Sequence, residues 1–225
     1  MAAKLDKHEL NEPDKLQIFF LRIRTFAEKH RIRFYAGGGI FLLIAFLAGG
    51  WYLYRDHYQT SAGKISSQIF EAAAKVGSPA GDMAAIKGYK ELISQYPRSQ
   101  AAVTAYYRLG NLYLGRREYD AAIVAYQEFL QNSSAESDLM TLAYGGLGAS
   151  QEAKKDFNKA LEAYDMAMKT SSANSFEALN YSNIARIHEA KNDPVKAAEF
   201  YRKALEKTTD PLMTLYLKRK LAILG

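Results

Sequence analysis

Residues 85–204 repeat one pattern four times at intervals of 37 or 38 residues, which leaves few folds open to the chain. The pattern is Ala–apolar–x–x–Tyr–x–x–apolar. A small residue lets two helices approach closely, and a tyrosine four residues later lies on the same helical face. The alanines are Ala85, Ala122, Ala160 and Ala197, and the tyrosines are Tyr89, Tyr126, Tyr164 and Tyr201. A period of this length predicts stacked helical units.

A second pattern, Tyr–x–x–apolar–small, precedes three of these segments. It begins at Tyr106, Tyr144 and Tyr181. Each unit is therefore predicted to contain a first helix (helix A), a short turn and a second helix (helix B). In the last turn Asp193 is a good N-cap and Pro194 a good first helical residue.

These residues resemble tetratricopeptide repeats, whose signature combines W-x2-L-G-x2-Y with A-x3-F and a proline. The similarity covers residues 103–134, 141–172 and 178–209. A degenerate unit, with its helix A at 61–76, precedes them, and Asp210-Pro211 opens a final capping helix. The resemblance implies an all-α solenoid over residues 61–225, with atypical terminal units.

Residues 34–54 form 21 consecutive residues without a charge. A helix of this length spans roughly 30 Å, the thickness of a bilayer's hydrocarbon core. Tyr35 at one end and Trp51, Tyr52 and Tyr54 at the other are typical of interfacial aromatic belts. A buried core helix is the alternative, but soluble helices rarely run this long without a charge. We therefore expect a transmembrane helix at 34–54.

The span is predicted to be an uncleaved signal anchor with its N-terminus in the cytoplasm. A cleaved signal peptide has a shorter apolar core and a small-residue cleavage site, which residues 55–62 do not supply. The preceding 15 residues carry five positive charges, and the following 15 carry only Arg55 and Lys64. By the positive-inside rule, residues 61–225 are expected in the periplasm of a bacterium, after a linker at 55–60.

The net charge of +6 divides into +3 for residues 1–33 and +3 for residues 55–225. The basic density therefore lies beside the predicted cytoplasmic leaflet, where anionic lipid attracts it. This distribution argues against nucleic-acid binding. Within residues 14–33 an amphipathic helix is predicted, which binds either lipid or a membrane partner. Its apolar face comprises Leu16, Phe19, Phe20, Ile23 and Ala27.

The layout of a basic tail, one anchor and a periplasmic repeat domain resembles the YfgM-type ancillary subunits of the bacterial Sec translocon. The supporting residues are Phe19-Phe20, Phe26-Ala27-Glu28, the glycine-rich span and Trp51-Tyr52. The resemblance implies an inner-membrane protein associated with SecYEG and with periplasmic chaperones or translocating chains.

The residues predict no catalytic, cofactor or metal site. With no cysteine, thiolate chemistry is excluded. His188-Glu189 begins like a zinc motif, but Asn192 stands at the second ligand position, so we expect His188 to pack between helices. Ser61 and Lys64 match S-x-x-K without its companion motifs. The glycines at 145, 146 and 148 lie in a helix A, where we expect them to admit a neighbouring helix or a ligand chain.

What remains is a protein-binding groove on the concave side of the solenoid, which helices A line. The resemblance implies groove positions two, five, nine and twelve of each repeat. These are Thr104, Tyr107, Asn111, Leu114, Leu142, Gly145, Ala149, Glu152, Leu179, Ser182, Arg186 and Glu189. Tyr107 and Arg186 are the expected anchors, because Tyr and Arg dominate interface hot spots. Asn111 suits a clamp for a C-terminal carboxylate, but Tyr107, Gly146 and Leu179 do not.

The function predicted from these features is a non-enzymatic, membrane-anchored scaffold near the Sec exit. Three alternatives remain open. One is an adaptor of the same architecture for envelope biogenesis, cytochrome maturation or division. Another is an enzyme using Ser61 and Lys64, and the third is a cytoplasmic adaptor of reversed topology.

Overall fold

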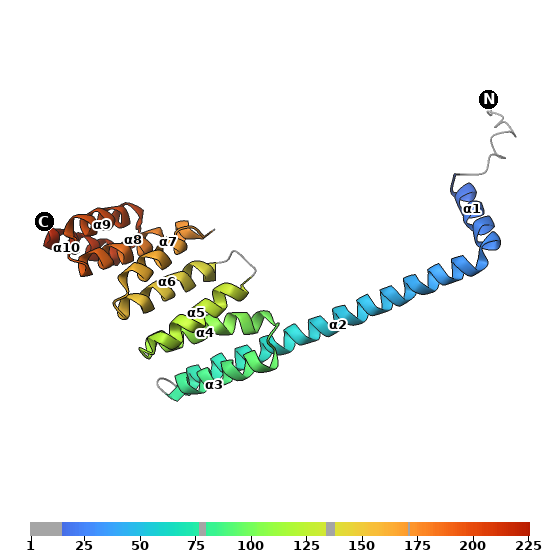
Figure 1. The fold of residues 1–225 in the computed structure, drawn as a ribbon, viewed down its shortest axis with the longest axis horizontal. Coiled ribbons are helices and arrows are strands. Elements are labelled where there is room, and N and C mark those ends of the chain that lie inside the picture. Colours follow the sequence, from blue (N-terminus) through green and yellow to red (C-terminus); the bar gives the residue numbers. More distant parts are fainter. Residues whose placement is uncertain (1–14, 77–79, 134–137, 171) are drawn as a thin grey trace, which may run out of the picture. The chain divides into compact units, whose positions relative to one another are not determined.

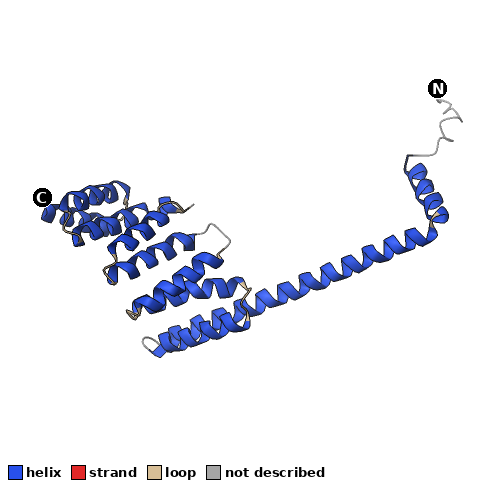
Figure 2. Cartoon of the chain, viewed as in Figure 1, coloured by secondary structure: helices blue, strands red, loops and turns tan. Residues whose placement is uncertain are grey.

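The computed structural model describes residues 15–76, 80–133, 138–170 and 172–225 (Figure 1). Every element in these ranges is a helix, and they contain no strand (Figure 2). The helices are α1 (Lys15–Lys29), α2 (Arg31–Val76), α3 (Ala80–Gln95), α4 (Gln100–Gly115), α5 (Tyr119–Asn132), α6 (Asp138–Ala153), α7 (Phe157–Ala167), α8 (Ala173–Ala190), α9 (Pro194–Lys207) and α10 (Pro211–Leu224). The all-α prediction is confirmed.

The chain divides into two compact units, Met1–His57 and Tyr58–Gly225. The first contains α1, whose Leu16, Phe19, Phe20 and Ile23 are exposed, and the apolar part of α2. Among the described residues, α2 is the one helix long and apolar enough to cross a membrane. Residues 55–60 lie inside α2 rather than in a linker, because they include no proline to interrupt the backbone hydrogen bonds of the helix.

The second unit consists of the predicted helical hairpins. Helices α4 and α5, α6 and α7, and α8 and α9 are helices A and B of the three repeats. The part of α2 from Tyr58 onward packs with α3 as the degenerate first unit, and Ala62 on it is fully buried. Helix α10 follows Asp210-Pro211 as expected and packs on α9 through Leu217.

The turn between helix A and helix B has the same geometry in all three repeats. Arg117, Lys155 and Asn192 adopt left-handed backbone conformations, with φ of 62°, 64° and 57°. The amide of the next residue then donates to a carbonyl five residues back, at 2.9 Å each time. This Schellman-type arrangement satisfies a carbonyl that the ending helix leaves unpaired. The turn therefore fixes the angle at which helix B folds back.

Side chains cap the starts of several helices. The Asp193 carboxylate accepts a hydrogen bond from the Lys196 amide at 3.1 Å, with Pro194 at the first helical position, as predicted. Ser99, Asp156 and Asp210 cap α4, α7 and α10 in the same way. Each cap satisfies a backbone donor that has no partner inside its helix.

The repeat alanines and tyrosines form the core between the helices. Ala122, Ala160 and Ala197 are fully buried. The tyrosines of the B helices of the three repeats, Tyr126, Tyr164 and Tyr201, are also fully buried, and we call them the helix-B tyrosines. The small side chains bring the helices together and the rings fill the space behind them, as the spacing predicts.

Candidate protein-binding groove

Seven of the twelve predicted groove positions line one pocket of about 280 Å³, which we call the groove pocket. They come from helices A of three successive repeats, α4, α6 and α8. The seven are Tyr107, Asn111, Leu114, Leu142, Gly145, Ala149 and Leu179. Six further residues complete the lining: Tyr126, Thr141, Gly146, Phe176, Asn180 and Asn183. Residues that lie far apart in the sequence, between positions 107 and 183, thus line a single pocket.

Tyr107, one expected anchor, stands at the wall of this pocket. Its ring lies 5.6 Å from the Phe129 ring and 6.2 Å from the Tyr126 ring, centroid to centroid. Aromatic pairs at such distances stabilise each other beyond their buried area. These two ring contacts hold Tyr107 in place at the wall of the pocket.

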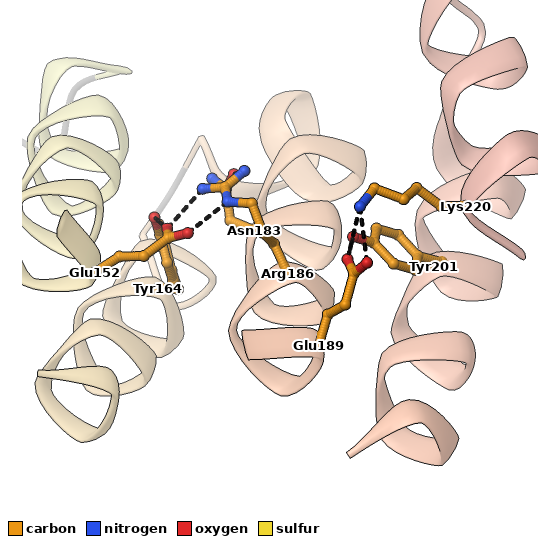
Figure 3. Close-up of polar contacts among 7 residues, drawn as sticks. All are labelled: Glu152, Tyr164, Asn183, Arg186, Glu189, Tyr201 and Lys220. Atoms are coloured by element: carbon orange, nitrogen blue, oxygen red, sulfur yellow. Dashed lines mark hydrogen bonds and ion pairs between the residues drawn. The ribbon is translucent and has the colours of Figure 1, made fainter. Parts of the chain in front are cut away.

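Arg186, the other expected anchor, is bound within the chain. Its Nε and Nη2 donate to the two carboxylate oxygens of Glu152 at 2.6 and 2.7 Å, and its Nη1 donates to Asn183 at 3.1 Å (Figure 3). Glu152 lies on α6 and Arg186 on α8, so this fork joins two repeats. Hydrogen bonding to Glu152 raises the pKa of Arg186, although burial opposes the rise.

Glu189 makes the corresponding contact one repeat later. Lys220 of α10 donates to both of its carboxylate oxygens at 2.8 Å (Figure 3). Burial alone would raise the pKa of Glu189, but hydrogen bonds from Lys220 and Tyr201 hold it below its ordinary value. Both carboxylates and both cations are therefore committed to joining helices.

Of the other two predicted positions outside the pocket, one is hydrogen-bonded within its own helix and the other is buried. The Thr104 hydroxyl donates to the Gln100 carbonyl of its own helix at 3.0 Å. Ser182 is buried, because helix α8 turns this position toward the core. The groove prediction therefore separates into residues that line the pocket and residues that join helices.

The hydroxyl of each helix-B tyrosine donates a hydrogen bond to a residue of helix A in the same repeat. The Tyr126 hydroxyl donates to Asn111 at 2.7 Å, Tyr164 donates to Glu152 at 3.1 Å, and Tyr201 donates to Glu189 at 2.8 Å. Burial raises the pKa of all three above the ordinary 10.0, so they remain neutral donors at physiological pH.

Two adjacent glycines of α6 have different surroundings. A Cβ on Gly146 would lie 2.3 Å from Cζ of Tyr126, so only glycine admits that ring. A Cβ on Gly145 would meet no atom within 4 Å. Gly148 likewise admits the Tyr164 ring, at 2.7 Å. The expectation that this glycine run admits a neighbouring helix is confirmed for Gly146 and Gly148.

Asn180, which the sequence did not single out, is only 2% exposed and lines the groove pocket. Its Nδ2 is buried and has no hydrogen-bond partner among the described residues. A buried donor without an acceptor destabilises a protein by about 1–3 kcal/mol. The signal available in the sequence was an asparagine inside a helix, where this residue is unfavourable without a specific role.

The described residues contain no group of three or more His, Asp or Glu side chains that could hold a metal ion. His188 packs as predicted, its ring stacked on Phe200 at 5.5 Å between centroids. The groove pocket itself is lined by apolar side chains and by the neutral amides of Asn111, Asn180 and Asn183.

Helical hairpins stacked in this way define an α-solenoid. The chain belongs to the family described as tetratricopeptide repeat-like domain, which matches residues 35–225. The protein ycf37 of Cyanophora paradoxa is 29% identical over 127 residues, which cover 56% of this chain and 70% of that protein.

Solved structures share the fold. A crystal structure of MamA aligns with a TM-score of 0.57 at 18% identity, over 72% of this chain and 81% of MamA. MamA from Desulfovibrio magneticus RS-1 aligns with a TM-score of 0.52 at 18% identity, over 63% and 75% of the two chains. A chain of the APC/C hetero-tetramer Cut9–Hcn1 aligns with a TM-score of 0.52 at 16% identity, over 63% of this chain and 27% of that one.

Proposed function

We propose that this protein is a membrane-anchored, non-enzymatic scaffold that holds a segment of a partner protein in the groove pocket. The observation that carries the proposal is the convergence of α4, α6 and α8 on one pocket with an apolar wall and neutral amides. Repeat folds of this family are typical of protein–protein interaction scaffolds, and one chain that shares the fold was solved in the APC/C hetero-tetramer Cut9–Hcn1.

The proposal includes the membrane and the compartment. Residues 34–54 anchor the chain, the five positive charges before them keep the N-terminus in the cytoplasm, and the repeats lie in the bacterial periplasm. Anchoring raises the effective concentration of a weak groove interaction at the membrane surface. The layout supports association with SecYEG and with chaperones or chains leaving the translocon.

Site-specific photocrosslinking in cells tests the groove. A photoreactive amino acid is placed at Tyr107, and as a control at Glu162, which is exposed on α7. We expect adducts with other proteins from position 107 and few from position 162. Equal adduct formation at both positions would contradict a role for the groove.

Affinity purification of the full-length chain in mild detergent tests the partner. We expect SecYEG and periplasmic chaperones to be recovered. Recovery of only division or cell-wall proteins would instead indicate an adaptor for another envelope pathway.

A C-terminal reporter that is active only in the periplasm tests the orientation. The proposal expects activity. Activity of a reporter that works only in the cytoplasm, fused at the same position, would show that the topology is the reverse of the proposed one. It would exclude association with the periplasmic face of the translocon.

A further inference from the structure

The groove pocket carries no charged side chain, although charged pairs join the repeats on its C-terminal side. The difference arises at two positions of the repeat. Position twelve of the second repeat is Glu152, and position nine of the third is Arg186; the two form the bidentate pair. One repeat earlier these positions hold Leu114 and Ala149, both of which line the pocket. Between the first and second repeats, an apolar pocket wall thus occupies the place that the Glu152–Arg186 ion pair has between the second and third.

The nearby cations cannot attract an anionic ligand without losing their present partners. Arg186 is held by both oxygens of Glu152 and by Asn183, and Lys220 by both oxygens of Glu189. A ligand carboxylate would compete with a carboxylate already in bidentate geometry, the strongest arrangement available to arginine. The pocket is therefore unsuited to a free C-terminal carboxylate.

The amides of the pocket are oriented as donors. Asn111 Oδ1 accepts from the Tyr126 hydroxyl, and Asn183 Oδ1 accepts from Arg186. These contacts occupy the carbonyl oxygens and leave the Nδ2 groups for a ligand. Asn180 adds a buried Nδ2 with no partner among the described residues. All three amides suit an acceptor, and the acceptor that recurs along any extended polypeptide is the main-chain carbonyl.

From these contacts we infer that the groove pocket binds an internal, extended, uncharged segment of polypeptide, through its main-chain carbonyls and one or more apolar side chains. This inference rests on the proposed scaffold function and specifies its ligand. The volume of about 280 Å³ lies near the lower limit for pockets that hold small ligands, so it suits a few residues of a chain rather than a folded surface. Tyr107, Leu114 and Leu142 supply apolar contact with the segment.

The test is selection from a random peptide library on the full-length chain in mild detergent. The library presents segments of about 12 residues, long enough to cross the pocket when extended, with both ends joined to a carrier. We expect the enriched segments to share an uncharged stretch. Synthetic versions of one enriched segment, with an amidated or a free carboxyl terminus, should bind with affinities within about twofold of each other.

Two variants connect binding to the pocket. A Cβ at position 145 meets no atom within 4 Å, and Gly145 lines the pocket, so Gly145→Leu should fill part of the pocket and weaken binding about tenfold or more. Asn180→Leu removes the unpartnered donor, so it should weaken binding about tenfold while leaving the thermal midpoint of the free chain unchanged or raised. An asparagine with only a structural role would give the opposite pattern, a lower midpoint with unchanged affinity.

The inference is overturned if the enriched segments are acidic, if binding needs a free carboxyl terminus, or if no segment discriminates wild type from Gly145→Leu. Protein adducts at Tyr107 in cells together with any of these results would leave the scaffold function standing and remove only the proposed ligand class. Absence of those adducts would remove the scaffold function itself.

Discussion

Replacing Gly145 and Gly146 separately by alanine gives opposite predictions for neighbouring residues of one helix. Alanine in a helix interior is favoured over glycine by about 0.5–1 kcal/mol, because glycine loses more backbone freedom on folding. At Gly145 the new Cβ meets nothing within 4 Å, so Gly145→Ala should stabilise the repeat domain by that amount.

At Gly146 the same gain is outweighed by a collision. The new Cβ would lie 2.3 Å from Cζ and 2.5 Å from the hydroxyl oxygen of Tyr126. That ring is fully buried, and it also packs closely against Gly110, where an added Cβ would lie only 2.6 Å from the ring. Overpacking costs about 1–3 kcal/mol, and displacement of the Tyr126–Asn111 hydrogen bond adds about 1 kcal/mol. Gly146→Ala should therefore destabilise the domain by about 2 kcal/mol net.

Thermal unfolding followed by far-ultraviolet circular dichroism measures the difference. For a domain of this size 1 kcal/mol shifts the midpoint by about 2–4 °C, so Gly146→Ala should lower it by about 4–8 °C while Gly145→Ala raises it slightly. In a Tyr126→Leu background the Gly146→Ala cost should shrink, since the ring that collides is gone. Equal midpoints for the two single variants would refute the packing of Tyr126 against Gly146.

Three further predictions concern other contacts. Glu152→Gln should destabilise the domain by about 1–2 kcal/mol, because it weakens the partly exposed bidentate pair with Arg186. The control Glu162→Gln, at an exposed position, should change stability by less than about 0.5 kcal/mol. Urea unfolding of both variants measures the two free-energy changes. Asp193→Ala removes the cap of α9 and should cost about 1 kcal/mol in the same assay, a result contradicted by an unchanged midpoint. Burial raises the pKa of the helix-B tyrosines above 10.0, so the unfolded chain releases their protons at lower pH than the folded chain does, and the stability of the domain should fall as pH rises above about 10. Thermal midpoints across this pH range, with ultraviolet titration of tyrosinate, measure this loss. A midpoint that does not change with pH would refute the prediction.

The hairpins, their order and most helix starts could be predicted because they depend on short-range rules. A small residue four positions before a tyrosine places both on one helical face, and Asp193-Pro194 marks a helix start by itself. The continuity of α2 could not be read from a change in composition after residue 54. A helix does not end where hydrophobicity ends, only where its backbone can no longer continue.

The sequence predicts which residues of helices A lie on the groove face, but it does not show which of them line the pocket and which join neighbouring helices. Helical periodicity places Arg186 on the correct face of α8, yet whether a guanidinium there is free depends on a residue one repeat away. Stacking brings residues about 34 positions apart side by side, as in Lys154 with Asp120 and Lys191 with Asn158. Opposite charges about 34 positions apart, which is one repeat minus one helical turn, are therefore the sequence signal that identifies Glu152 and Arg186 as partners.

The same comparison of aligned repeats explains where the pocket lies. At position twelve the three repeats hold Leu114, Glu152 and Glu189, and each glutamate takes both a tyrosine hydroxyl from its own helix B and a cation from the next unit. The first repeat has no such carboxylate, and its tyrosine turns to Asn111 instead. Position nine of the second repeat is likewise Ala149 where the third repeat has Arg186, and this alanine and the glycines of α6 line the pocket beside α4. In the proposed function, the repeat that departs from the pattern thus supplies the ligand pocket, while the repeats that keep the pattern are joined to the next unit by ion pairs.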